Sequence, residues 1–151
     1  MIKNLTVNSD RKIKINKNAI HKIISLLKSE FSFDVISLPI NFITSEQIIQ
    51  INTQYLGHNF STDIITFNYS GENDSFDGEI FISVDDAFSN SKKYKVSLDN
   101  EIIRLVIHGI LHLLGFDDKN KFDLKKMKKE ENRLVSEFEK NTIKIIIKYD
   151  C

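Results

Sequence analysis

Apolar residues recur every three or four positions along several stretches of the chain, with polar residues between them. Ile20, Ile23, Ile24 and Leu27, for example, fall on one side of a helix, which is typical of an amphipathic helix. The pattern predicts helices over residues 17–31, 45–56, 84–94, 98–114 and 123–139. Side chains that cap helix N-termini stand before three of them: Asn16 or Asn18, Thr44 or Ser45, and Ser97 or Asp99.

Three shorter segments are rich in β-branched and aromatic residues and predict strands. They begin near Val35, at Thr62 and at Glu79, and residues 142–149 have the same character with no identifiable partner. Because helices and strands are mixed without a strict strand–helix–strand alternation, we expect an α+β fold rather than a doubly wound parallel sheet. The expected architecture is a small mixed sheet of about four strands with helices packed on it.

The chain has 151 residues, with one proline, five glycines and no low-complexity linker, so we expect a single domain over residues 1–151. Its one cysteine, Cys151, excludes a disulfide within the chain. The first residues lack the continuous apolar stretch of a secretory signal, and no window approaches the roughly 20 apolar residues of a membrane span. These features predict a cytoplasmic protein.

Charge offers no general support for nucleic-acid binding, because 21 basic and 21 acidic residues balance to a net charge of zero. The one basic cluster, KKMKK at residues 125–129, is followed at once by Glu130 and Glu131. We interpret this cluster as a solvated helix face.

The helix predicted over residues 98–114 carries the candidate chemistry. Residues 101–115 are all Ile, Leu or Val apart from Gly109, Gly115 and a stripe of polar residues at spacings of three or four: Glu101, Arg104, His108 and His112. Histidines four residues apart point the same way, so both imidazoles can reach one metal ion. The alternative is that the stripe is simply the solvent-exposed face.

Three neighbouring features favour the metal. Gly109 is unfavourable inside a helix by about 1 kcal/mol, which indicates close approach of another group. Gly115 is well placed to end the helix in a left-handed conformation, with Phe116 making the usual apolar contact. Asp117 or Asp118 can then fold back toward the histidines as a third ligand. Three ligands with an open position are typical of catalytic zinc.

The eleven residues from His108 to Asp118, HGILHLLGFDD, resemble the YbeY endoribonuclease family of bacterial rRNA maturation factors, whose pattern is H-G-x-L-H-L-x-G-[YF]-D-H. Every fixed position agrees except the last, where Asp118 stands in place of the usual third histidine ligand. Residues 52–67 and 78–82 are also similar to family segments. One further departure is Leu56, since many members carry an arginine directly after the preceding tyrosine.

The resemblance implies an α+β fold with a metal cleft at the end of the central apolar helix. It implies metal-dependent cleavage of single-stranded RNA, used in maturing the 3′ end of small-subunit rRNA and in ribosome quality control. His108, His112 and Asp118 are then the metal ligands and catalytic residues, and the expected cofactor is one zinc ion. The expected partners are single-stranded RNA, rRNA and the ribosome, with neither DNA nor a membrane among them.

Four further residues are weaker candidates for this site. Arg104 and His58 are candidate phosphate contacts, although Arg104 is also placed to pair with Glu101. His58 is alternatively a fourth ligand or a loop residue with no role. Asp63 and Glu79 are candidates for accepting a proton or orienting a metal ligand. The nucleophile stays open between a water activated by the metal and the RNA 2′-hydroxyl.

Three other functions remain in view. The protein can be a ribosome-assembly factor whose metal only organises the cleft, since the arginine and the third histidine are both missing. A zinc peptidase-like hydrolase is less favoured, because Gly109 occupies the position of the glutamate base in H-E-x-x-H. The last alternative is a structural protein without metal.

Overall fold

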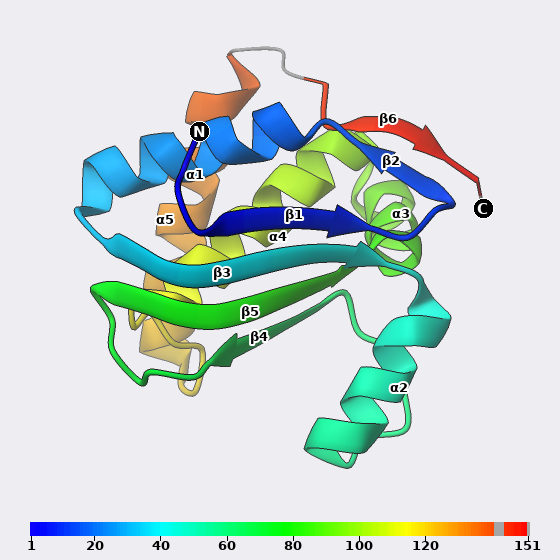
Figure 1. Ribbon diagram of the computed structural model, residues 1–151, viewed down its shortest axis with the longest axis horizontal. Helices are drawn as coiled ribbons and strands as arrows, with labels where there is room; N and C mark the ends of the chain where they lie inside the picture. The colour runs from blue at the N-terminus through cyan, green and yellow to red at the C-terminus, as the bar shows by residue number, and fades with distance from the viewer. Residues whose placement is uncertain (141–143, 151) are drawn as a thin grey trace.

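The computed structural model describes residues 1–140 and 144–150. Their helices and strands follow one another along the chain as labelled in Figure 1. In order they are β1 (Leu5–Ser9), β2 (Ile13–Ile15), α1 (Lys17–Phe31), β3 (Asp34–Ile43), α2 (Ser45–Leu56), β4 (Ile64–Asn68), β5 (Ser75–Ser83), α3 (Val84–Tyr94), α4 (Leu98–Leu113), α5 (Lys121–Glu139) and β6 (Ile146–Tyr149).

The main sheet has four strands in the order β1-β3-β5-β4. Strands β1, β3 and β5 run parallel, with Ile40 of β3 beside both Val7 of β1 and Ile80 of β5. The edge strand β4 pairs antiparallel with β5, and its Thr66 lies opposite Ile80. The predicted α+β fold with a small mixed sheet is therefore confirmed.

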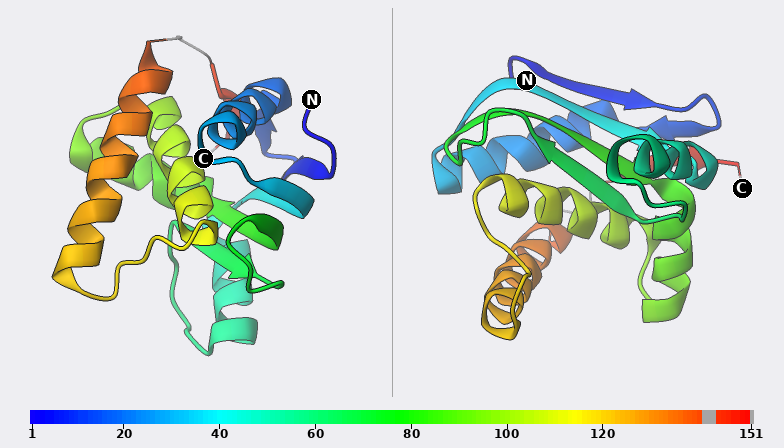
Figure 2. Two further views of the ribbon diagram at one scale, coloured as in Figure 1. Left: turned by 90° about the vertical axis from the view of Figure 1, so that its left-hand side faces the viewer. Right: turned by 90° about the horizontal axis from the view of Figure 1, so that it is seen from below.

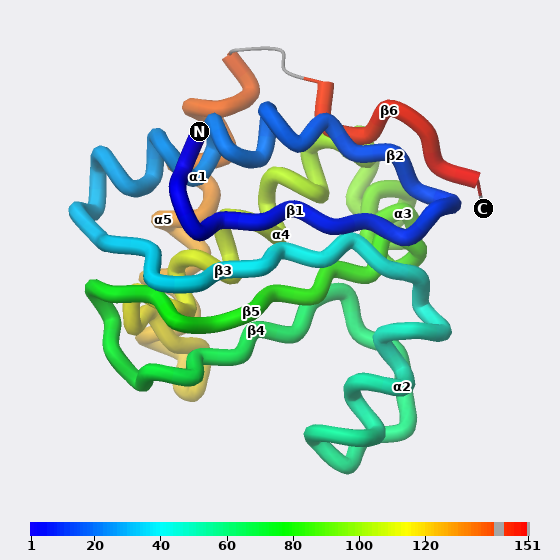
Figure 3. The backbone as a smooth tube through the Cα atoms, in the orientation of Figure 1, coloured from blue at the N-terminus to red at the C-terminus, as the bar shows by residue number. Residues whose placement is uncertain are grey.

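Strands β1 and β2 were not predicted from the sequence. Each strand buries only two residues, Leu5 and Val7 in β1 and Ile13 and Ile15 in β2. Two alternating apolar positions are too few to show a clear period in the sequence. Strand β6 confirms part of the strand expected at the C-terminus, and it pairs antiparallel with β2 in a separate two-stranded sheet (Figure 3). Residues 142 and 143 of that prediction lie outside the described residues.

Helices α1, α4 and α5 form layers on one side of the main sheet (Figure 2). Figure 2 shows α1 and α4 against the same face of the sheet, with α5 on the far side of α4. Gly109 allows the close packing of α4, because a Cβ atom there would lie 2.9 Å from Ile80 Cδ1 and 3.3 Å from Ile64 Cδ1. The group that approaches the Gly109 backbone is therefore the sheet itself.

Helix starts follow the capping residues closely. Asn16, Thr44 and Ser97 cap α1, α2 and α4, and in each case the side chain accepts a hydrogen bond from a backbone N–H in the first turn. Thr44 also forms a full capping box with Gln47. Over residues 1–140 and 144–150, no helix combines the length and apolar character that crossing a bilayer requires.

Candidate metal centre

The polar stripe lies on α4, a helix whose other residues are mostly buried. The packing of this helix fixes the position of the stripe. His108 and His112 are partly exposed, and their ring centroids lie 4.7 Å apart with the ring planes at 75°. The stripe borders β4 on one side and α5 on the other, since a cavity beside His108 is lined by Ile64 and Glu131. Both imidazoles are therefore presented in one direction by a rigid element.

Helix α4 ends in a Schellman motif, which turns the chain back toward the histidines. The N–H of Gly115 donates to His112 O at 3.0 Å, and the N–H of Phe116 donates to Leu111 O at 3.0 Å. Gly115 has φ +104°, in the left-handed region that favours glycine. Phe116 packs against the hydrophobic core. The predicted end of the helix at Gly115 is confirmed.

The two aspartates after this turn have different positions. The Asp117 carboxylate accepts a hydrogen bond from the Lys119 N–H at 2.6 Å, which stabilises the turn itself. Asp118 instead joins the histidine pair: one ligand atom from each of His108, His112 and Asp118 lies within 4.8 Å of the other two. Of the two aspartates, the structure thus brings Asp118 to the candidate site.

The residues present fit a metal ion after a modest closure. A tetrahedral zinc with bonds of about 2.1 Å holds its ligand atoms about 3.4 Å apart, so separations of up to 4.8 Å have to shorten by at most about 1.4 Å. Asp118 lies on an exposed loop, where its side chain has room for that movement. Two nitrogens and one carboxylate oxygen are a ligand set that suits zinc. The adjoining cavity of about 450 Å³, here called the metal cavity, also contacts Thr66 and Asn68 of β4.

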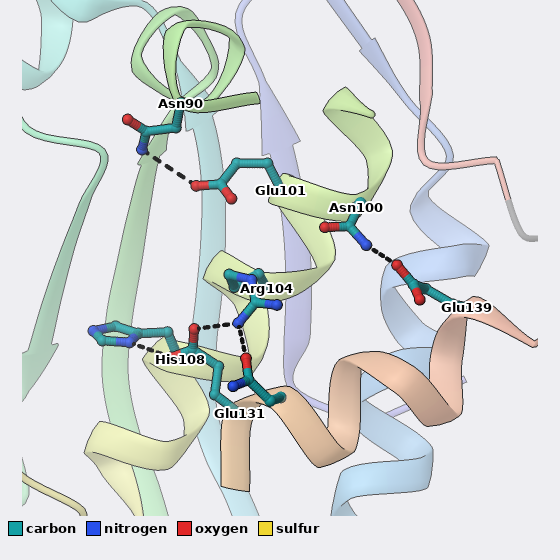
Figure 4. A network of polar contacts seen from close by, with 8 residues as sticks. Asn90, Asn100, Glu101, Arg104, His108, Glu131 and Glu139 are labelled. Carbon is teal, nitrogen blue, oxygen red and sulfur yellow. Dashed lines mark hydrogen bonds and ion pairs between the residues drawn. The ribbon is translucent and has the colours of Figure 1, made fainter. Parts of the chain in front are cut away.

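Glu131 of α5 contacts the His108 ring and fixes its orientation (Figure 4). Its Oε2 lies 2.8 Å from His108 Nδ1, and its Oε1 accepts from Arg104 Nη1 at 2.9 Å. A carboxylate can only accept here, so Nδ1 carries the proton and Nε2 is the ring nitrogen left to face a metal. Glu131 itself is 5% exposed. Burial raises the pKa of Glu131, but the hydrogen bonds from His108 and Arg104 outweigh it and leave the pKa lowered.

The electrostatics of the cavity favour neutral imidazole at the second ligand. Burial lowers the pKa of His112, and the neighbouring His108 lowers it further, although Asp118 acts in the opposite direction. Neutral imidazole is the form that binds a metal. Burial also raises the pKa of Asp63, against the effects of His108 and a hydrogen bond from Asn90. A carboxyl group with a raised pKa therefore lies beside the histidines.

Two of the four weaker candidates lie at the site. Asp63 lines the metal cavity and also a second cavity next to it, and its Oδ2 accepts from Asn90 Nδ2 at 3.0 Å. Of these two cavities, Arg104 lines the second but not the metal cavity. Its ion-pair partner is Glu131 rather than Glu101, which corrects the pairing expected from the sequence, because α5 packs directly over this part of α4.

The other two candidates lie elsewhere. Gly78 and Ile80 of β5 face α4. Because side chains alternate along a strand, that of Glu79 points to the opposite face of the sheet. There it accepts hydrogen bonds from Tyr69 and Asn41. His58 is exposed on the loop after α2, stacks on Phe60 at 5.2 Å, and does not line the metal cavity.

Sequence reasoning missed two residues of this region. Glu131 lies on the apolar side of α5, between Met127 and Leu134, and a charged residue at a core position is the signal that identifies it. Asn90 of α3 links Asp63 to Glu101 by donating to both carboxylates, at 3.0 and 3.2 Å. No sequence signal points to Asn90, since its neighbours in space are distant along the chain.

The chain is similar to known proteins over most of its length. The family described as Endoribonuclease YbeY matches residues 3–139. An endoribonuclease YbeY of Azobacteroides pseudotrichonymphae is 48% identical over 92 residues, which are 61% of this chain and 66% of that protein. One from Chlorobium phaeobacteroides is 31% identical over 134 residues, covering 89% of this chain and 94% of the relative.

A solved structure supports the fold independently. The solution structure of TM1509 from Thermotoga maritima superposes with a TM-score of 0.64 and 25% sequence identity. The match covers 91% of this chain and 93% of that protein. The arrangement of helices on the mixed sheet is therefore shared over nearly the whole length of both.

Proposed function

The chain belongs to the endoribonuclease YbeY family of metal-dependent hydrolases, and from this premise we propose that it is a metal-dependent endoribonuclease acting on single-stranded RNA. The RNA that we propose is ribosomal, cut at the 3′ end of the small-subunit rRNA. The same activity would serve ribosome quality control in the cytoplasm. We further propose that residues 1–151 form one such hydrolase domain.

The convergence of three ligand atoms at one cavity carries this proposal. His108, His112 and Asp118 present them within 4.8 Å of one another, and the cavity of about 450 Å³ beside them is open to a substrate. These residues would hold a single zinc ion, with His108 binding through Nε2. When bound, zinc supplies a Lewis acid that polarises a phosphoryl oxygen and lowers the pKa of a bound water toward about 7.

Asp63 is the residue of the chain that we assign to moving the proton. It lines the metal cavity, and burial raises its pKa above the ordinary value for an aspartate. Asn90 occupies Oδ2, so Oδ1 is the atom assigned to take the proton from the attacking hydroxyl or water. Arg104 does not serve as the phosphate contact in this assignment, because its guanidinium is held by Glu131 and Asn132.

A non-catalytic ribosome-assembly factor is the second candidate function. It is favoured by Asp118, which is exposed and replaces the usual histidine, and by Leu56 in place of the arginine of many members. A zinc peptidase is disfavoured, because Gly109 stands where the H-E-x-x-H motif has its glutamate base. Position 109 faces Ile80 and Ile64 of the sheet, which leave no room for a glutamate side chain.

The deciding experiment measures metal content and RNA cleavage together. Wild type is compared with His108→Ala, Asp118→Ala and Asp117→Ala, each purified without chelator and assayed on a labelled single-stranded RNA and its duplex. We expect about one equivalent of zinc in wild type and in Asp117→Ala, and its loss from His108→Ala and Asp118→Ala. Cleavage should follow the metal and should be confined to the single strand.

The results separate the candidates clearly. Zinc without cleavage in wild type, together with ribosome association that survives His108→Ala, would establish the assembly factor. Absence of metal from wild type would exclude both functions that depend on it. Equal zinc loss in Asp117→Ala and Asp118→Ala would contradict the assignment of Asp118, because Asp117 then acts as a ligand or the turn alone controls binding.

A further inference from the structure

One side of α5 carries a row of lysines, here called the lysine face: Lys121, Lys125, Lys128 and Lys129. The first three follow at spacings of four and three residues and form one stripe of about 10 Å along the helix. All four side chains are exposed. Within the described part of the chain, none of them forms an ion pair with a carboxylate.

The acidic residues of the same helix do not neutralise this face. Glu131 is buried and bound to Arg104 and His108, and Glu130 is bound to Arg133. At the start of the helix, the Asp123 carboxylate accepts a hydrogen bond from Asn120 Nδ2, and the Asp123 backbone N–H donates to Asn120 Oδ1. The lysine face is therefore a locally positive surface on a chain whose net charge is zero.

Three neighbouring cavities that share lining residues, here together called the hollow, lead from the metal cavity to the lysine face. The second cavity, here called the side cavity, has a volume of about 370 Å³ and shares Asp63, Ile64 and His108 with the metal cavity. A shallow groove of about 490 Å³ along the lysine face shares Leu124 and Lys128 with the side cavity. A chain that leaves the metal cavity past His108 thus reaches the lysines.

We propose that the lysine face binds the phosphates of the RNA segment next to the cleaved phosphate, and that the nucleotide between them occupies the side cavity. This inference rests on the proposed function and names how the same site holds its substrate. A stripe of about 10 Å is long enough to face roughly three phosphates of a stacked strand. Unpaired lysines are the ordinary means by which proteins hold an RNA backbone.

The lining of the side cavity indicates that it holds a base rather than a phosphate. The carboxylates of Asp63 and Glu101 line it and repel a phosphate, whereas Glu101 can accept a hydrogen bond from a base amino or imino group. Leu105 and Met127 supply apolar walls, and Tyr94, 60% exposed, is an aromatic surface on which a base can stack. The phosphates then remain outside, at the level of Lys128.

An anionic membrane is the other partner that a basic helix can fit, because Phe122 and Leu124 beside the lysines are exposed. The continuity with the metal cavity favours RNA. A bilayer surface can cover the lysine face but cannot enter the side cavity past Lys128, whereas a single strand can occupy both. The experiment therefore includes vesicles as a separate arm.

Fluorescence anisotropy with a labelled oligouridylate of about 20 nucleotides, longer than one typical binding site, tests the proposal. The zinc-loaded chain, its Lys125→Gln/Lys128→Gln variant and a Lys17→Gln/Lys22→Gln control are titrated at several salt concentrations. Gels are run on each sample, and only readings taken while the RNA is uncut are used. The control removes two exposed lysines from α1, a helix outside the hollow. Circular dichroism verifies that both variants fold.

Each lost phosphate contact flattens the dependence of log K on log salt by about 0.7 for single strands. The lysine-face variant should therefore flatten it by about 1.4, so that a fourfold rise in salt weakens wild type roughly sevenfold more than the variant. The control should match wild type. Where RNA is cleaved, KM should rise in the lysine-face variant while kcat stays the same.

Two results would overturn the inference. Identical salt dependence in wild type and the lysine-face variant would show that these lysines do not contact the RNA. Lysine-dependent binding to phosphatidylserine vesicles with unchanged RNA binding would assign the face to a membrane. Because anisotropy measures binding alone, an inactive wild type with lysine-dependent RNA binding would reject the endoribonuclease proposal and retain the RNA-binding face.

Discussion

Replacement of Glu131 by glutamine is the sharpest test of how the site is built. Glutamine has nearly the same shape but offers one acceptor oxygen and one NH₂ group in place of two acceptors. Arg104 is only a donor, so it takes the amide oxygen, and the NH₂ group then faces His108 Nδ1. His108 must move its proton to Nε2 to accept that hydrogen bond. A protonated Nε2 cannot bind a metal ion.

Both stability and metal affinity should fall, by amounts that follow from these contacts. Arg104 loses its carboxylate but is 27% exposed and can reach water, so we expect the lower end of the range for charged hydrogen bonds, about 1–2 kcal/mol. That is a decrease in Tm of roughly 2–8 °C for a chain of this size. Loss of a group that orients a metal ligand typically weakens affinity by about 10–100-fold.

The matched control is Glu130→Gln, one residue earlier on the same helix. Glu130 pairs with the half-exposed Arg133 at the surface, where an ion pair contributes about 1 kcal/mol or less. Zinc affinity is measured by competition with a chromophoric chelator, and unfolding is followed thermally with and without zinc. We expect a large loss of zinc affinity in Glu131→Gln and none in Glu130→Gln.

Unchanged zinc affinity in Glu131→Gln would refute the reasoning, because it would mean that the His108 tautomer is not set by Glu131. Equal losses in both variants would refute it as well, since the effect would then come from the charge of α5 in general. A loss of stability without a loss of zinc affinity would reduce Glu131 to a packing role.

Three further changes test the fold and its electrostatics. Gly78→Ala would place a Cβ atom 2.4 Å from Phe67 O, so urea unfolding should show a loss of about 1–3 kcal/mol as β4 and β5 separate. Burial raises the pKa of Asp85, but the Ser45 N–H and the Tyr149 hydroxyl outweigh it and lower the pKa. The stability advantage of wild type over Asp85→Asn should be complete above the ordinary value of 3.8 and disappear as pH falls through the lowered pKa. Burial raises the pKa of Glu101 above its ordinary value of 4.5. Wild type should therefore lose stability as pH rises from 4.5 through the raised pKa, whereas Glu101→Gln, unfolded under the same conditions, should not show this loss.

The helices were predictable from sequence because each combines a clear apolar period with a recognisable end. For α4 the cap at Ser97 and the left-handed Gly115 are both local signals, and the structure has them as expected. Strands β1 and β2 were missed because five and three residues give too little period, and their burial depends on partners far along the chain. The pairing of β2 with β6 joins the two ends of the chain and has no local signal.

The candidate site likewise has one part that the sequence predicts and another that only the structure shows. His108, His112 and Asp118 lie within one turn of helix and the loop that follows it. Helical spacing places the two histidines together, but it leaves the third ligand open between Asp117 and Asp118. Their surroundings come from α5 and α3, and long-range packing decides which polar residues lie there. Arg104 thus pairs with Glu131, 27 positions away, rather than with Glu101 three positions before it on the same helix.

In the proposed function, helix α5 would link metal binding to RNA binding. Leu56 is an apolar, half-exposed residue where many family members carry an arginine, and Arg104 is held by Glu131. Among the described residues of the hollow, the cations without a carboxylate partner are therefore the lysines of α5. The same helix supplies Glu131, which orients His108. A shift of α5 would change the metal ligand and the path of the RNA together, so loading with zinc should favour the helix position that also binds the substrate.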